Sequence, residues 1–171
     1  MLTAIGAVLV IGATATVGIT SLWRMGTRVR VLSALIVALE VMKSEVCDRM
    51  TPIPELIDQL AEEAPAPVNL LFRRLQAEMG EIGIRSFYFL WKNAILASPD
   101  LALREAEQET LIALGQSLGR YDANQQRDAF VYAQRRLERY LSKAELERSQ
   151  QGKVHAALSI AVGVFMVIIL L

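Results

Sequence analysis

The stretch of sequence that decides the fold reads VRVLSALIVALEVMKSEV at residues 29–46. Apolar side chains recur there at intervals of three and four residues, at Val29, Leu32, Leu35, Ile36, Leu39, Met42 and Val46. This spacing places them on one face of an α-helix, with the polar residues on the other face. Because such a face must be covered by other elements, the stretch predicts a helix that packs inside a helical domain.

The sequence that follows repeats the helical pattern in shorter segments. The apolar stripes cover residues 56–60, 68–79, 87–95, 103–118 and 130–144. Thr51-Pro52-Ile53-Pro54 ends the first helix, since proline lacks an N–H and restricts the residue before it, and Thr51 is expected to cap the next helix. Ser98-Pro99 is expected to open a later helix that ends at Gly119. No segment reads convincingly as a strand. We therefore expect an all-α fold, an antiparallel six-helix bundle.

Both ends of the chain lack charge. No Asp, Glu, Lys, Arg or His occurs at residues 1–23 or 156–171, so all 18 basic and 18 acidic residues lie between them. An apolar helix of about 20 residues spans the hydrocarbon core of a bilayer. We expect transmembrane helices at residues 1–23 and 154–171, the second short for a full crossing, flanking a helical domain at residues 24–153. A cleaved signal peptide ending near Ala13-Thr14-Ala15 is the alternative, although no basic residue precedes the apolar run.

The charges that flank the two spans predict the orientation. Arg24, Arg28 and Arg30 follow the first span, and Arg148 and Lys153 precede the second. Basic residues favour the cytoplasmic side, so the domain is expected in the cytoplasm. Trp23, Arg24 and Lys153 are the expected membrane anchors at the interface.

Composition argues against several classes of function. The formal net charge is zero and the isoelectric point is about 6.6, so a broad basic face for nucleic acid is not expected. The single cysteine, Cys47, cannot form an intrachain disulfide and is expected in the core. No phosphate loop, zinc spacing or dinucleotide fingerprint occurs. We expect no catalytic residues, no cofactor, no metal and no small-molecule substrate.

Charge is unevenly distributed within the domain. Residues 51–65 carry four acidic residues and no basic residue, whereas residues 123–153 carry seven basic and four acidic residues. These stretches could be complementary surfaces for a partner or for copies of the same chain, or solvated helix faces only. Glu105, Glu107 and Glu109 lie near an expected helix start, where the helix dipole favours negative charge.

A spaced pair of glycines is the most distinctive local pattern. Gly115 and Gly119 are followed by Asp122 and Gln126 in the run LGxxLGxxDxxxQ. Glycines four residues apart clear one helix stripe so that another backbone can approach closely. Two readings stay open: a tight helix contact with a C-cap at Gly119 and an N-cap at Asp122, or a groove for a partner helix.

These residues together resemble a known family, the stage III sporulation protein AB family. The resemblance rests on the uncharged ends, on the passage from Ala38-Leu39-Glu40 through Glu45-Val46 to Thr51-Pro52-Ile53, and on the glycine run. It departs after Lys153, where His155 and Leu158-Ser159 stand in place of an aromatic residue and a Leu-Gly pair. On this resemblance Glu45, Thr51 and Pro52 join Gly115, Gly119, Asp122 and Gln126 as candidates for packing or partner binding.

The resemblance also implies a function and partners. Members are similar to the helical cytoplasmic domain of the type II secretion system F protein. The chain is therefore expected to be a non-enzymatic membrane component of the channel-like complex between mother cell and forespore, in the outer forespore membrane. A secretion-type ATPase and sister membrane subunits are the expected partners, and self-association is a further expected contact. The alternatives are a general secretion or pilus platform outside sporulation, and a membrane-bound hydrolase that uses Cys47 or His155.

Overall fold

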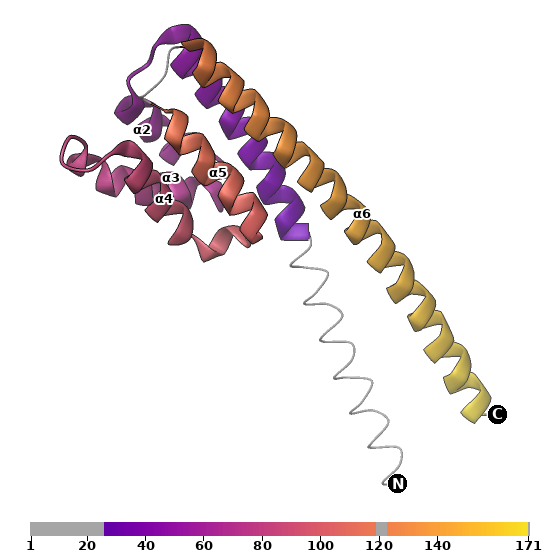
Figure 1. Cartoon of the computed structure of the whole chain (residues 1–171). Helices are drawn as coiled ribbons and strands as arrows, with labels where there is room; N and C mark the ends of the chain where they lie inside the picture. Colours follow the sequence, from indigo (N-terminus) through magenta and orange to yellow (C-terminus); the bar gives the residue numbers. More distant parts are fainter. Residues whose placement is uncertain (1–25, 119–122, 171) are drawn as a thin grey trace. The chain divides into compact units, whose positions relative to one another are not determined.

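The structure is a computed structural model that describes residues 26–118 and 123–170, with side chains described for 26–118 and 124–150. Six α-helices occur in these residues and no β-strand does, which confirms the all-α class (Figure 1). The first helix covers residues 26–44 and is followed by α2 (Ile53–Glu63), α3 (Val68–Glu78), α4 (Phe87–Leu96), α5 (Glu105–Ser117) and α6 (Ala123–Leu170). Short helices occupy Glu45–Arg49 (η1), Met79–Glu81 (η2) and Pro99–Leu101 (η3).

The chain divides into two compact units. One is Arg28–Ser142, which holds the helices that pack together, and the other combines Met1–Thr27 with Lys143–Leu171. In the second unit α6 keeps a helical backbone as far as Leu170, with no break at Gly152. The helix that begins at Ala123 therefore continues into the C-terminal apolar segment.

The structure describes only a part of the predicted membrane segments. Residues 1–23, with Trp23, lie outside the described residues, as does Arg24, and only the helical backbone of residues 151–170, including Lys153, is described. Among the helices that were described, none combines the length and the apolar character needed to cross a membrane. The segment boundaries at residues 23 and 153 therefore stay predictions.

The first helix supplies one side of the core of Arg28–Ser142. Its face of Leu32, Leu35, Leu39 and Met42 is fully buried, as the three- and four-residue spacing predicts, and the flanking Val29 is only half-buried. The largest buried side chains from other helices are Phe72, Trp91 and Phe130. Apolar burial of this kind is the main source of stability for a helical domain.

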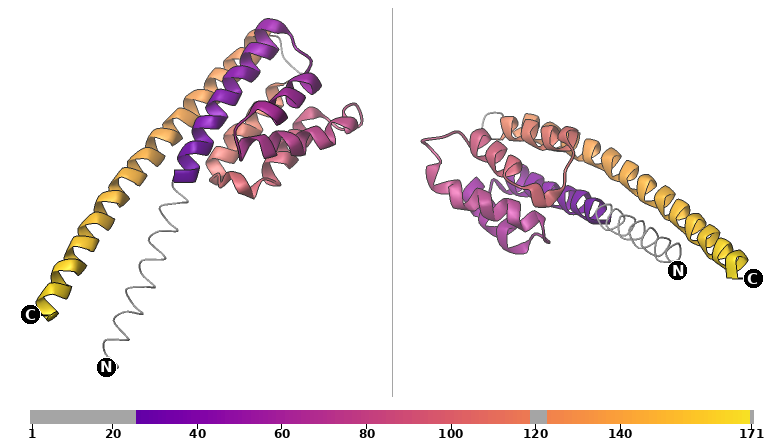
Figure 2. Two further views of the ribbon diagram at one scale, coloured as in Figure 1. Left: turned by 180° about the vertical axis from the view of Figure 1, so that it is seen from behind. Right: turned by 90° about the horizontal axis from the view of Figure 1, so that it is seen from below.

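The helices pack mainly against their neighbours in sequence. α2 lies against α3, α3 against α4, and α4 against α5. The first helix and the beginning of α6 run side by side in both views of Figure 2. Gln134 on α6 donates a hydrogen bond of 2.7 Å to Glu40, and Arg127 forms an ion pair of 2.5 Å with Asp48. Polar contacts thus hold the distant ends of the domain sequence together.

One expected helix start is wrong. Ser98-Pro99 begins only the short helix η3, and α5 starts later, at Glu105. The Ser98 hydroxyl donates to the carbonyl oxygen of Ala94 at 2.6 Å and accepts from Arg74 at 2.9 Å, so it closes α4 and cannot cap a new helix. Ala102 then adopts a left-handed conformation with φ of 48° and breaks the chain away from the helical path.

The expected cap at Thr51 is also wrong. Pro52 occupies the N-cap position of α2, and no side chain caps that helix. The Thr51 hydroxyl instead donates a hydrogen bond of 2.6 Å to Glu45. This contact fixes the corner between η1 and α2.

Candidate functional site

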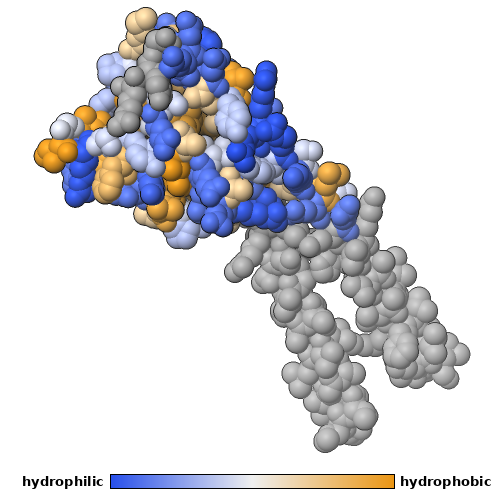
Figure 3. Space-filling view, viewed as in Figure 1, coloured by the Kyte–Doolittle hydropathy of each residue, from blue (hydrophilic) through white to orange (hydrophobic). Residues whose placement is uncertain are grey.

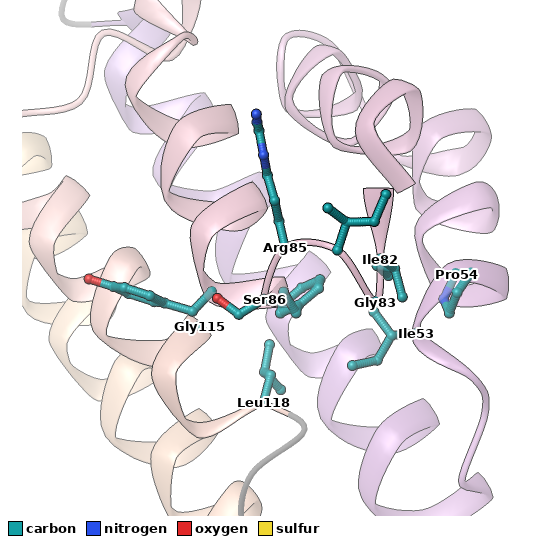
Figure 4. Close-up of a pocket in the computed structure, with 11 residues that line it drawn as sticks. Ile53, Pro54, Ile82, Gly83, Arg85, Ser86, Gly115 and Leu118 are labelled. Carbon is teal, nitrogen blue, oxygen red and sulfur yellow. The ribbon is translucent and has the colours of Figure 1, made fainter. Parts of the chain in front are cut away.

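The candidate site is a groove at one end of the helical unit, with a cavity volume of about 490 Å³ (Figure 4). Three segments form it: the start of α2, residues 82–88, which comprise a loop and the first two residues of α4, and the end of α5. Ile53 and Ile82 lie on one side of the hollow and Leu118 lies on the other. Its lining is therefore mainly apolar, and we call it the groove.

The loop before α4 exposes apolar side chains at the rim of the groove. Gly83 has φ of 99°, a conformation that favours glycine, and the Arg85 N–H donates to the carbonyl oxygen of Glu81 at 2.9 Å to close the turn. As a result Ile84 is 86% exposed and Ile82 is 41% exposed. Figure 3 shows apolar surface gathered at the tip of this loop. Exposed apolar residues beside a hollow are typical of protein contact sites.

The positively charged side chain of Arg85 lies beside this apolar rim. Arg85 forms an ion pair of 3.1 Å with Glu81, and its guanidinium carbon lies 5.2 Å from the centre of the Phe89 ring. Ser86 caps α4 by accepting the Phe89 N–H at 3.4 Å. These contacts fix the loop at the start of α4, so the rim is a built surface.

The wall of the groove depends on the missing side chain of Gly115. A Cβ atom there would lie 2.3 Å from Cδ1 of Trp91, which is closer than real Cβ contacts come. The Trp91 indole N–H donates to the carbonyl oxygen of Leu111 at 2.6 Å, one turn before Gly115. The sequence suggested that another backbone would use the space at Gly115, and in the structure an indole ring fills it.

Of the residues predicted from the resemblance that the structure describes, only Gly115 lines the groove. Glu45 is buried and accepts hydrogen bonds of 2.6 Å from both Thr51 and Arg49. Pro52 leads directly into Ile53 of the lining, and Gly115 lines the opposite side. Gly119 and Asp122 lie outside the described residues, while Gln126 is half-buried and makes a polar interaction.

Two features of the site escaped prediction from the sequence. The first is the exposure of Ile84. The sequence held one hint of it, because Ile84 directly follows Gly83, and glycine is typical of a surface turn. Glu107 could not be distinguished from Glu105 and Glu109, yet it is 1% exposed in its side chain and pairs with Arg28 at 2.5 Å. Its second oxygen accepts the backbone N–H of Arg104 at 2.8 Å, which caps α5.

The chemistry of the described residues favours contact over reaction. No group of His, Cys, Asp and Glu within the described part of the chain is arranged to hold a metal ion. Cys47 is buried, and burial raises the pKa of its thiol above the usual 9.0, so the thiolate is disfavoured at neutral pH. The His155 side chain lies outside the described part. The groove itself is lined by two hydroxyl-bearing residues, Ser86 and Tyr88, and by the guanidinium of Arg85 among apolar walls, which suits an apolar side chain of a partner.

Comparison with known proteins identifies the family. The family model described as stage III sporulation protein AB matches residues 3–171. The stage III sporulation protein AB of Bacillus subtilis (strain 168) is 26% identical over 172 residues, covering 100% of both chains. A solved structure of a stage III sporulation protein AB is similar with a TM-score of 0.67 and 26% identity, over 72% of this chain and 98% of that one. The chain belongs to the stage III sporulation protein AB family.

Proposed function

We propose that this protein is a non-enzymatic membrane component of the channel- or secretion-like complex between mother cell and forespore, required for endospore formation. Its antiparallel six-helix bundle serves as a platform for a secretion-type ATPase and for sister membrane subunits. Membership of a sporulation family and the similar solved structure support this role. The protein needs no cofactor or small-molecule substrate for it.

Two membrane helices position the platform. The absence of charge at residues 1–23 and 156–171 supports them, and the unbroken helical backbone of α6 through Leu170 agrees with the second. The basic residues that flank both segments favour the cytoplasmic side for the domain. Membership of the sporulation family supports the mother cell as that cytoplasm and the outer forespore membrane as the site of the anchors.

The groove is the proposed contact site for the ATPase. The observation that carries this proposal is one mainly apolar hollow that Ile53, directly after Pro52, and Gly115 both line and whose rim exposes Ile84. Partner recognition through a few apolar anchors in a partly preformed hollow is energetically favourable, because little surface must be reorganised.

A pair of substitutions tests the proposal. Ile84→Glu places a charge at the groove rim, whereas Val37→Glu places one on another exposed apolar residue, in the first helix, which is 58% exposed. In a deletion strain, Val37→Glu is expected to restore heat-resistant spores and Ile84→Glu is not, with both proteins at equal levels in the membrane fraction. Heat-resistant spores from the deletion strain itself would overturn the sporulation role, and full rescue by Ile84→Glu would overturn the groove as the contact.

A further inference from the structure

The outward face of α6 within Arg28–Ser142 carries basic and aromatic residues. Phe130, Ala133 and Leu137 are buried on the inner face of this helix. Tyr132, Arg135 and Arg139 follow at intervals of three and four residues on the opposite face, where Arg135 and Arg139 are exposed and Tyr132 is 58% exposed. We call this set, together with Arg136, the basic face.

Arg136 orders the basic face. Its guanidinium donates to the hydroxyl of Tyr140 at 2.7 Å and to that of Tyr132 at 3.2 Å, and its carbon lies 5.8 Å from the centre of each ring. Long side chains held in this way lose less freedom on binding. Neither Arg135 nor Arg139 has an ion-pair partner among the described residues, so their charges stay available to another molecule.

The exposed side of α2 carries the opposite charge. Glu55, Asp58, Glu62 and Glu63 lie on the solvent side of this helix, opposite the buried Leu56, Ile57, Leu60 and Ala61. Asp58 and Glu63 accept hydrogen bonds from the uncharged amides of Gln76 and Gln59. No basic side chain in the described part of the chain pairs with any of the four, which we call the acidic face.

The two faces match in length but not in position within one molecule. Glu55 and Glu62 are seven positions apart, as are Tyr132 and Arg139, which is about 10 Å along a helix axis. Figures 1 and 2 show α2 on the far side of the first helix from α6, so the two faces cannot meet within one copy. They can meet between two copies.

We infer that the basic face of α6 docks on the acidic face of α2 in a second copy of this chain. The contact joins two different surfaces, so it is head-to-tail, and repetition leads to a ring or an open row of subunits. Neither face includes a residue that lines the groove, although Glu55 directly follows the lining residue Pro54. The inference concerns self-assembly alone and stands apart from the proposed binding of the ATPase.

Charge reversal on each face separately tests this contact. One full-length variant carries Arg135→Glu with Arg139→Glu, and another carries Glu55→Arg with Glu62→Arg. The matched control is Lys92→Glu, which reverses an exposed charge on α4 away from both faces. Self-association of each protein in detergent micelles is measured by sedimentation velocity, and circular dichroism verifies that helix content is unchanged.

The wild type and the Lys92→Glu control are expected to associate, more weakly as salt rises. Each double variant alone should associate at least about tenfold more weakly than the wild type, since like charges then face each other. An equimolar mixture of the two variants should associate again. The new glutamates on α6 of one variant then meet the new arginines on α2 of the other, and the unchanged acidic and basic faces pair in the same way. A wild type that stays monomeric, association that ignores both reversals, or a mixture that behaves like its separate components would each overturn the inference.

Discussion

Trp91 occupies the space that a side chain at residue 115 would need. A Cβ on Gly115 would lie 2.3 Å from Cδ1 and 3.1 Å from Nε1 of the indole. The indole N–H donates a hydrogen bond to the carbonyl oxygen of Leu111, and the ring centre lies 6.0 Å from that of Phe87. These contacts hold the indole in place. Glycine at residue 115 is therefore a packing requirement where α4 meets α5.

Gly115→Ala is expected to lower the free energy of unfolding by about 1 to 2 kcal/mol. Alanine favours the helix by about 1 kcal/mol, but overpacking a full core costs about 1 to 3 kcal/mol, and the 2.3 Å contact with Trp91 puts this site in the upper part of that range. Chemical denaturation of the full-length protein in detergent measures the change. Gly80→Ala is the control, because no atom lies within 4 Å of its added Cβ. A Gly115→Ala protein as stable as the wild type would contradict the packing requirement.

The ion pair between Arg28 and Glu107 should contribute strongly to the fold. Replacing Glu107 by leucine removes the carboxylate that pairs with Arg28 at a site where both side chains are 10% exposed or less, and it removes the cap of α5. Loss of one partner of a buried pair costs about 3 to 5 kcal/mol. Glu109→Leu, on the exposed side of the same helix, should change stability by less than about 0.5 kcal/mol. Equal losses for the two variants in thermal unfolding would show that the pair has no special weight.

The hydroxyl of Thr51 should matter more than its size. Thr51→Val keeps the shape but deprives the buried Glu45 carboxylate of one donor, so we expect a loss of about 1 to 2 kcal/mol. Thr51→Ser keeps the donor and should remain within about 0.5 kcal/mol of the wild type. Denaturant midpoints distinguish the two variants. A valine variant as stable as the serine variant would mean that Arg49 alone satisfies Glu45.

Cys47 should be protected from alkylation while the domain is folded. Burial raises the pKa of its thiol above 9.0, so the folded state holds the proton more tightly than the unfolded state does. This contribution to stability is fully present below the unfolded pKa and is lost as pH rises through the higher folded pKa. Maleimide labelling at pH 8 should therefore be slow in the native protein and fast in denaturant. Rapid labelling of the native protein would contradict burial.

Sequence spacing was sufficient to predict the helices with continuous apolar stripes. Leu32, Leu35, Leu39 and Met42 fulfil the pattern because their interval places them on one helix face, whereas Val29 and Ile36 of the same predicted stripe are only half-buried. It failed at Ser98 and Thr51, where a hydroxyl with the right local context for a cap bonds elsewhere in the tertiary structure. Local capping rules cannot anticipate a competing acceptor such as the Ala94 carbonyl oxygen.

The candidate site was only partly accessible from the sequence. Gly115 was recognised as a place of close approach, but the sequence could not name Trp91, which lies 24 residues earlier. The groove itself depends on three segments that only the fold brings together. Glu107 shows the same limit, because its partner Arg28 is 79 residues away and its neighbours Glu105 and Glu109 have identical chemistry.

The most direct test of the platform role is photo-crosslinking from the groove rim in sporulating cells. A photoreactive phenylalanine analogue at residue 84 of the full-length protein is compared with the same analogue at residue 37. The account predicts a crosslink to the secretion-type ATPase from residue 84 and none from residue 37. A crosslink to the ATPase from residue 37 only, or its absence at residue 84 while spore formation proceeds normally, would contradict the account.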